Sequence, residues 1–356
     1  MRPGARAALR AVGAALLALA VARAADTPLP KRLFGRRAGE GSTARRSRGR
    51  AQDRCEGARG PLPPALSYEL RAGAFPGSGH PDVAVHVPPG FDATDAPGAI
   101  LYFHGWNGCV AAALSGEDVP CTEGGDARPG SDLARQLDDA RVNALLVAVE
   151  LRVDMATGEP GALQASGGVR ELMRELLDEH LAEPLGCRID VQELDRIVVV
   201  AHSGGYQAAA STLAFGDLPQ ITEVDLLDAY YGADDVVRSW ALDAVDRYDR
   251  SRRFVDLYTT GGGTGDRSRS LAALLGAEDG AATMLASDDG DAEVDDELLA
   301  HPVVVKHVPR EHMDLPRAYF RALVASAGFV GTHAAGASGG EPAPDATTSD
   351  PHAARP

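Results

Sequence analysis

The sequence predicts an α/β fold in which a mostly parallel central sheet is covered by helices on both faces. Strand-like and helix-like segments alternate along residues 62–331, which is typical of such a sheet. The run at 197–200 is continuously apolar and β-branched, as in strands that are buried on both faces. The segment at 169–181 carries apolar residues at helical spacing. A stretch of this length can form one large domain with a full core.

The expected elements follow one another in a regular order. Strands are predicted from short apolar runs at 83–87, 99–103, 144–149, 196–202, 224–228, 254–259 and 302–308. Helices are predicted between them at 131–140, 169–181, from 206 to 213, 234–244, 269–275 and 316–327. Ser131 is the expected N-cap of the first helix.

Both ends of the chain differ in composition from this domain. Residues 1–24 hold arginines, an apolar stretch too short to span a bilayer and then Ala-Arg-Ala, which predicts a cleaved secretory signal peptide. Residues 25–61 read as a basic disordered linker, and residues 332–356 as a disordered tail rich in Pro, Ala, Gly and Ser. We therefore expect a secreted or periplasmic protein without stable membrane insertion. A permanent anchor is the alternative.

The charge balance excludes one class of partner. The formal net charge is −16, and many of the basic residues lie in the two segments before residue 62, so the domain itself is strongly acidic. Acidic surfaces repel phosphate backbones and anionic membranes. We expect no nucleic-acid partner, although the basic linker leaves an arm for an anionic surface as an alternative.

Four cysteines, Cys55, Cys109, Cys121 and Cys187, predict disulfides. An even number in an exported protein favours disulfides, and the spacing matches no zinc motif. Of the three possible pairings we expect Cys109 with Cys121, which closes a short loop, and Cys55 with Cys187. Free buried thiols are the alternative.

Reactive side chains stand at three predicted strand ends. Ser203 follows the strand at 196–202, and a helix begins almost at once. Asp228 closes the strand at 224–228, and His312 lies just beyond the last strand. A hydroxyl nucleophile, a carboxylate and an imidazole are the groups that acyl transfer requires. The working groups of such sheets gather at the carboxyl ends of strands.

The motif Ala201-His202-Ser203-Gly204-Gly205 between strand and helix resembles that of the α/β-hydrolase superfamily of serine esterases and lipases. Its nucleophile motif is G-x-S-x-G, and its chain order is Ser, then Asp or Glu, then His. Ala201 stands in place of the first glycine. The His104-Gly105 pair at an earlier strand end is similar to the superfamily's oxyanion loop.

The resemblance implies roles for the motif residues. Ser203 would be the nucleophile, His312 the general base and Asp228 the acid. The backbone N–H groups of Gly204 and Trp106 would form the oxyanion hole. The other histidines nearby, His104, His202 and His307, are expected to orient or pack.

The acid is the hardest residue to assign, because the superfamily places it after either of two strands. Asp228 stands at the mouth of a buried strand, whereas Asp266 follows the glycine run at 261–263. A carboxylate that fixes a tautomer must be held rigidly, so we expect Asp228. Asp256 lies within its strand and is expected to be structural.

These features predict an exported serine hydrolase that cleaves a carboxylic ester or an amide through an acyl-enzyme. A peptidase or amidase with the same triad and a non-catalytic binding protein are the alternatives. The substrate is a small molecule or a polymer. Tyr206 and Tyr230, with Trp106 and Tyr231, lie near the strand ends and line either the substrate pocket or the core. Fewer than about thirty residues separate the strands where the superfamily commonly inserts a large lid, so we expect no lid domain.

Two other stretches resemble ligand sites in composition but not in spacing. The glycine-rich run at 259–265 lacks a dinucleotide or P-loop pattern. The acidic stretch at 288–297 lacks the spacing of an EF-hand. We therefore expect no cofactor and no metal.

Overall fold

The computed structural model describes residues 55, 62–63, 65–153, 158–246, 251–278, 285–288 and 293–332. The predicted signal peptide, the linker apart from Cys55 and the tail beyond Thr332 lie outside these residues. Among the helices of the described part, none is long and apolar enough to cross a membrane.

The described residues form a nine-stranded central sheet in the order β1-β2-β6-β3-β7-β8-β9-β11-β10. The strands are β1 (Leu66–Tyr68), β2 (Val83–His86), β3 (Gly98–Phe103), β6 (Ala144–Val149), β7 (Ile197–His202), β8 (Ile221–Leu227), β9 (Arg253–Tyr258), β10 (Leu285–Asp288) and β11 (Val303–His307). β2 pairs antiparallel with both β1 and β6. From β6 to β10 all pairs are parallel, which confirms the predicted α/β class.

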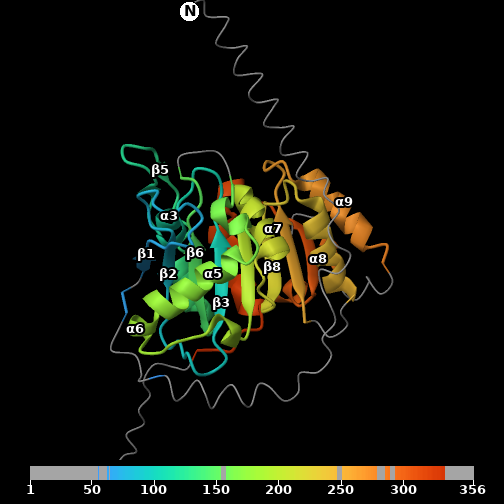
Figure 1. Cartoon of the computed structure of the whole chain (residues 1–356). Helices are drawn as coiled ribbons and strands as arrows, with labels where there is room; N and C mark the ends of the chain where they lie inside the picture. The colour runs from blue at the N-terminus through green and yellow to red at the C-terminus, as the bar shows by residue number, and fades with distance from the viewer. Residues whose placement is uncertain are drawn as a thin grey trace, which may run out of the picture.

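Helices cover both faces of the sheet. On one face lie α5 (Gly168–Glu175), α7 (Tyr206–Phe215), α8 (Asp234–Asp246) and α9 (Gly265–Leu275). On the other face lie α3 (Val110–Leu114), α4 (Leu133–Ala140), α11 (Asp296–Leu299) and α12 (Leu315–Ser326). Figure 1 shows the first group in front of the strands.

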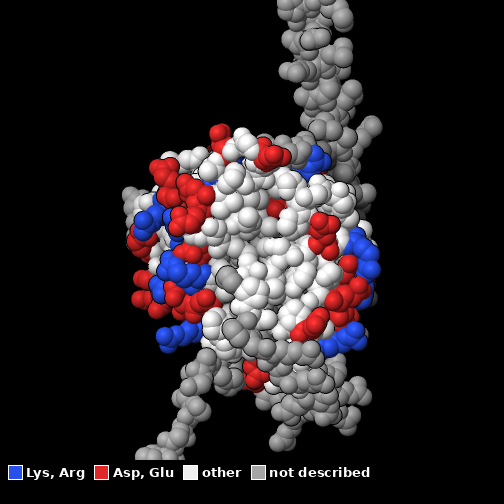
Figure 2. Space-filling view, turned by 90° about the vertical axis from the view of Figure 1, so that its left-hand side faces the viewer, with Lys and Arg blue, Asp and Glu red and all other residues white. Residues whose placement is uncertain are grey.

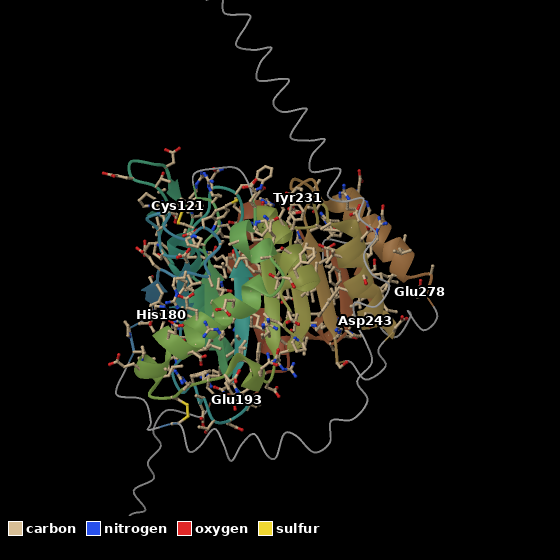
Figure 3. All side chains as sticks on the ribbon, viewed as in Figure 1. Cys121, His180, Glu193, Tyr231, Asp243 and Glu278 are labelled. Carbon is tan, nitrogen blue, oxygen red and sulfur yellow. A yellow bond between two sulfur atoms is a disulfide. The ribbon has the colours of Figure 1, made fainter. Side chains whose placement is uncertain are left out.

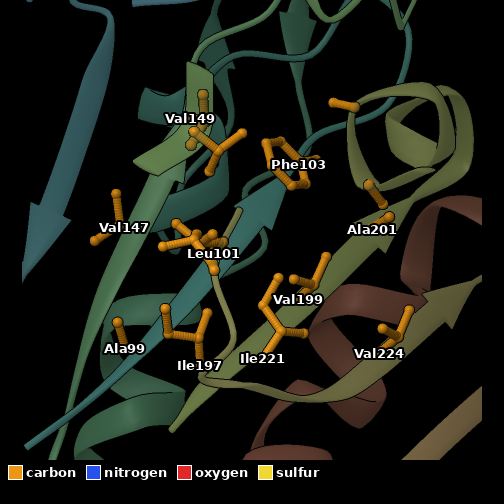
Figure 4. Close-up of a cluster of buried hydrophobic side chains, with 14 of the residues drawn as sticks. Ala99, Leu101, Phe103, Val147, Val149, Ile197, Val199, Ala201, Ile221 and Val224 are labelled. Carbon is orange, nitrogen blue, oxygen red and sulfur yellow. The ribbon is translucent and has the colours of Figure 1, made fainter. Parts of the chain in front are cut away.

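The apolar strands divide their side chains between two cores. Leu101 and Phe103 of β3 join the core under α5 and α7, and Figure 4 shows them among the aliphatic side chains of β6, β7 and β8. Ile100 and Tyr102 of the same strand join the core under α4 and α12. Successive side chains of a strand point to opposite faces, so a run that is apolar throughout is what a sheet covered on both sides requires.

Some details differ from the predicted elements. The expected helix at 169–181 is α5 followed by one wider turn at Leu176–His180, and a short helix, α6 (Ala182–Leu185), comes next. The N-cap of α4 is Asp132 rather than Ser131, and it makes no capping hydrogen bond. The edge strands β1 and β10 were not predicted, because strands of three or four residues show too little alternation to be recognised.

The two disulfides join Cys109 to Cys121 and Cys55 to Cys187, which are the predicted pairs. The first closes the segment from 109 to 121, which ends in β4 (Val119–Pro120). β4 pairs with β5 (Ala127–Arg128), which follows the disulfide, in a small hairpin. In Figure 3 Cys121 and Tyr231 both lie near the upper edge of the molecule, where the parallel strands end. The loop is therefore fixed on the side where a site is expected.

Charged side chains of both signs are mixed on the surface. Exposed pairs include Arg174 with Glu171 at 2.7 Å and Arg267 with Asp234 at 2.6 Å. On the face in Figure 2, acidic and basic side chains lie along both flanks of a broad uncharged middle. Exposed pairs contribute about 0–1 kcal/mol each, so the stability of the fold rests on its two cores.

Candidate active site

Ser203 sits at the sharp turn between β7 and α7. Its backbone φ is +52°, in the left-handed region that normally favours glycine. The turn is possible because Gly205 carries no side chain: a Cβ there would overlap the carbonyl oxygen of Phe103. A strained non-glycine residue of this kind costs about 1–3 kcal/mol and is found mainly at functional sites. The turn directs the Ser203 hydroxyl into a surface pocket.

Asp228 is the first residue after β8 and is wholly buried. Its backbone also has a positive φ, +47°, and its N–H donates to the carbonyl of Leu257 at 2.7 Å. The carboxylate accepts hydrogen bonds from three side chains. Thr259 Oγ1 donates to Oδ2 at 2.6 Å, Thr264 Oγ1 donates to Oδ1, and His312 Nδ1 lies 2.8 Å from Oδ2. Asp228 is therefore held as rigidly as a tautomer-fixing acid must be.

These donors determine the charge of Asp228. Burial raises the pKa of its carboxyl group, but the hydrogen bonds from His312, Thr259 and Thr264 outweigh burial and leave the pKa below its usual value. The carboxylate is thus ionised at neutral pH, and its acceptor oxygen keeps the proton of His312 on Nδ1. Nε2 is then the nitrogen that can accept a proton.

The glycine-rich run at 259–265 encloses the Asp228 carboxylate. A Cβ at Gly262 would overlap Oδ2 of Asp228, and the Gly262 N–H donates to Thr259 Oγ1 at 3.0 Å. The glycine-rich run therefore surrounds a carboxylate of the chain itself and not a phosphate. Sequence reasoning missed Thr259 and Thr264; the available signal was a hydroxyl on each side of three glycines directly after a strand.

Asp266, the alternative acid, lies in the first turn of α9 on the protein surface. Its side chain is 99% exposed and pairs with Arg269 at 2.6 Å. Because α9 begins at Gly265, the chain has already turned away from the sheet edge at this point. Of the two candidates, Asp228 is the one that contacts His312.

His312 is held by a second histidine. Its carbonyl lies 3.0 Å from Nε2 of His202, and the two rings are 4.9 Å apart. Burial, with a smaller contribution from the charge of His312, lowers the pKa of His202 to about 3. His202 is therefore neutral, and its Nε2–H donates to the His312 carbonyl. The residue before Ser203 thus orients the loop that carries His312.

Ser203 contacts Tyr231 rather than His312. Within the described residues no hydrogen bond joins Ser203 to His312. Burial and the charge of Asp228 raise the pKa of Tyr231, whereas a hydrogen bond with Ser203 acts to lower it. The Tyr231 hydroxyl donates to the carbonyl of Gly262, so its oxygen can accept the hydrogen of Ser203.

The loop after β3 packs tightly against the Ser203 turn. A Cβ at Gly105 would come within 2.8 Å of the Cβ of Ser203, and a Cβ at Gly204 would overlap the Trp106 indole. The glycines of the two loops are therefore required by close approach. This places Gly204 and Trp106, the expected oxyanion residues, beside the hydroxyl of Ser203.

A buried pair of side chains, His104 and Glu150, contacts the loop after β3. His104 Nδ1 lies 2.8 Å from the Gly105 carbonyl, and Nε2 lies 2.7 Å from Oε1 of Glu150. Burial acts to lower the pKa of His104, but the Glu150 carboxylate more than compensates and the pKa is raised. Glu150 Oε2 also accepts from the N–H of Val110 at 3.1 Å. The pair links the loop after β3 to the end of β6.

The pocket beside Ser203 is walled by the two loops and the disulfide. Its lining includes Trp106, Arg128, Pro129 and Met313, and Trp106 is 51% exposed. Tyr206 and Tyr230 are not among the residues that line it.

The sequence left Tyr230 open between the substrate pocket and the core. Tyr230 is 1% exposed and belongs to the core under α7 and α8. Tyr206 packs against that core with its ring 6.0 Å from Tyr231. In the Tyr230-Tyr231 pair, neighbouring side chains point in different directions, and the second is the one that reaches the site.

The described residues contain no group of three or more His, Cys, Asp or Glu side chains that could hold a metal ion. The acidic stretch at 288–297 lies partly outside them.

The comparisons find solved structures of similar fold but no matching family. No protein-family model matches the sequence, and no curated protein matches it. The chain is similar to a mutant feruloyl esterase module from Clostridium thermocellum complexed with sinapinate, with 10% identity, a TM-score of 0.47, and 77% of this chain and 94% of that chain covered. It is also similar to a ferulic acid esterase from Anaeromyces mucronatus in complex with ferulic acid, with 12% identity, a TM-score of 0.40, and 78% and 94% covered. A lipase from Bacillus licheniformis shows 13% identity and a TM-score of 0.34, with 71% and 96% covered.

Proposed function

We propose that the protein is an exported serine hydrolase that cleaves a carboxylic ester through an acyl-enzyme on Ser203. The observation that carries the proposal is the 2.8 Å contact between His312 Nδ1 and the buried Asp228 carboxylate, one strand away from a serine on a left-handed turn. A carboxylate that orients an imidazole near a serine hydroxyl at a pocket is the arrangement of acyl transfer.

The proposed reaction follows from these positions. His312 Nε2 removes the proton of Ser203, and Oγ attacks the ester carbonyl to give a tetrahedral oxyanion. The backbone N–H groups of Gly204 and Trp106 stabilise this oxyanion. His312 then donates the proton to the leaving alcohol as the C–O bond breaks. A water molecule, deprotonated by His312, attacks the acyl-enzyme, and collapse of the second intermediate releases the acid and restores the Ser203 hydroxyl.

Export is part of the proposal. The two disulfides fit a protein that matures in an oxidising compartment. The same catalytic groups could cleave an amide, which the substrate panel below separates from ester cleavage. A purely binding role would leave the buried ionised Asp228 and its contact with His312 without a purpose.

The test is active-site labelling with a fluorophosphonate. The wild-type protein should become labelled, and Ser203→Ala should abolish labelling and reduce hydrolysis by about 10⁵-fold or more. Ser270→Ala, a change of an exposed serine on α9, is the matched control and should leave both unchanged. Labelling of Ser203→Ala at the wild-type rate would rule out Ser203 as the nucleophile. A panel of 4-nitrophenyl esters of increasing length and of amino-acid anilides then separates esterase from peptidase activity.

A further inference from the structure

A single fixed cation lines the pocket beside Ser203. Arg128 is the only Lys or Arg among the described lining residues, and none of those residues is an Asp or Glu. Much of the remaining wall is apolar, including Trp106, Ala113 and Met313. A guanidinium in such a wall recognises a specific kind of substrate group, because its charge attracts an anion and its planar fork pairs with two oxygens.

The position of Arg128 is well defined by the chain around it. Its strand, β5, pairs with β4 so that Arg128 lies opposite Val119, and β4 belongs to the segment that the Cys109–Cys121 disulfide closes. After Pro129 comes Gly130, where a Cβ would overlap the carbonyl oxygens of Ser115 and Glu117. The arginine is therefore built into the pocket wall and is not on a free arm.

Arg128 has no anionic partner within the described part of the chain. It makes no ion pair and no side-chain hydrogen bond there, whereas exposed arginines such as Arg174 and Arg267 are paired with carboxylates. Its own loop carries four acidic residues, Glu117, Asp118, Glu123 and Asp126, but all four are exposed and none lines the pocket. A partly buried guanidinium without a counter-charge is incompletely satisfied, so the pocket can gain by taking an anion from outside.

We infer that the enzyme prefers an ester that carries a second, carboxylate group, and that Arg128 binds this carboxylate while the ester carbonyl lies at Ser203. The inference rests on the proposed function and specifies its substrate class. At long range the acidic protein repels such a substrate, but this repulsion is screened beyond about 8 Å at physiological salt. Inside the pocket the contact with Arg128 dominates.

The test compares two esters of equal length that differ in one charge: 4-nitrophenyl hemiglutarate and 4-nitrophenyl valerate. Wild type should show the higher kcat/KM for the charged ester. Arg128→Gln should lower kcat/KM for the charged ester by roughly 10- to 100-fold, the usual effect of losing a charged hydrogen bond, and should change the neutral ester less than about twofold. Arg321→Gln, at an exposed arginine of α12, is the matched control and should change neither. An ester that joins an uncharged acyl group to a hydroxy acid carries its carboxylate on the alcohol side, and its rate tells which half of the substrate meets Arg128.

Two further results separate failure of this inference from failure of the proposed function. If wild type cleaves the neutral ester but does not prefer the charged one, or if Arg128→Gln lowers both rates equally, Arg128 has no role in selection and the hydrolase proposal still stands. If wild type cleaves neither ester and resists the fluorophosphonate, the hydrolase proposal fails. In that case calorimetric titration of glutarate monomethyl ester into Ser203→Ala, with and without Arg128→Gln, still tests the site, and equal binding by both variants overturns the inference.

Discussion

Asp228 and Asp256 are two buried carboxyl groups on neighbouring strands, and they behave in opposite ways. Both are 0% exposed. Asp228, just beyond the end of β8, accepts hydrogen bonds from three side chains and has a lowered pKa. Asp256, inside β9, has two carboxylate oxygens that accept no hydrogen bond of good geometry within the described residues. Burial raises the pKa of Asp256 to about 7, Ser268 offsets this only in part, and the charge of Asp228 adds to it.

The comparison indicates that hydrogen-bond donors can outweigh burial in deciding whether a carboxylate is charged. At the end of β8 the chain is free to turn, and the run at 259–265 closes around Asp228 with two hydroxyls. Within β9 the backbone N–H groups are committed to the ladders with β8 and β11, and the side chain that acts on Asp256 is Ser268 of α9. At the end of β8 the hydrogen bonds are therefore sufficient to keep a buried carboxylate ionised, whereas at Asp256 they are not.

The largest expected loss of activity comes from replacing the charged carboxylate of Asp228 with a neutral amide. Asp228→Asn should lower kcat by about 10⁴-fold, because His312 then loses the acceptor that keeps its proton on Nδ1. Asp256→Asn should change kcat less than about threefold, since Asp256 does not contact His312. Circular dichroism first shows that both variants are folded. Steady-state kinetics with a 4-nitrophenyl ester then measures kcat of each variant. If Asp256→Asn proves the more damaging change, the acid assignment is wrong.

A smaller loss of activity is expected when the glycine-rich run at 259–265 is displaced from the Asp228 carboxylate. Gly262→Ala places a methyl group where Oδ2 of Asp228 lies, and we expect kcat to fall by about 10²-fold as the acid moves from its productive geometry. Gly261→Ala is the matched control, because nothing lies within 4 Å of a Cβ there. Equal activity of the two variants would show that enclosure by the loop does not matter.

Removing one donor should have a milder effect. Thr264→Val deletes a hydroxyl that donates to Asp228, so the pKa of Asp228 should rise toward its usual value and kcat/KM should fall by about tenfold. Thr260→Val, at a threonine that bonds His307 instead, should leave kcat/KM unchanged. Steady-state kinetics measures both variants, and a wild-type kcat/KM for Thr264→Val would contradict the role given to the donors.

The smallest effect on activity and a clear effect on stability are expected at Asp256. Because its folded pKa is raised to about 7, the folded state binds its proton more tightly than the unfolded state. Stability is therefore greatest below the ordinary pKa of the group and declines as pH rises to about 7. The wild-type free energy of unfolding should fall between pH 5 and pH 8. In Asp256→Asn this fall should be smaller than in wild type by on the order of 2 kcal/mol. Urea unfolding at the two pH values measures it, and an unchanged difference would mean that Asp256 is ionised in the folded protein.

Local patterns in the sequence were sufficient for most of the fold. The β-branched run before Ser203 predicted β7, and the glycines after it predicted the abrupt turn into α7. The disulfide Cys109–Cys121 followed from a short separation along the chain. These features depend on backbone preferences and on burial of neighbouring residues, so a short window of sequence contains them. Edge strands of three or four residues contain too little pattern and were missed.

Only the tertiary structure decided which side chains meet at the candidate site. Thr259 and Thr264 reach Asp228 from 31 and 36 positions away, and His312 reaches it from 84. Tyr230 and Tyr231 have the same side chain and adjacent positions, yet one enters the core and the other reaches Ser203. Arg128 became a pocket residue because a disulfide and a hairpin hold its loop beside the end of β3. Such contacts depend on where the strands end in space, and the residue types and their spacing along the chain do not contain that information.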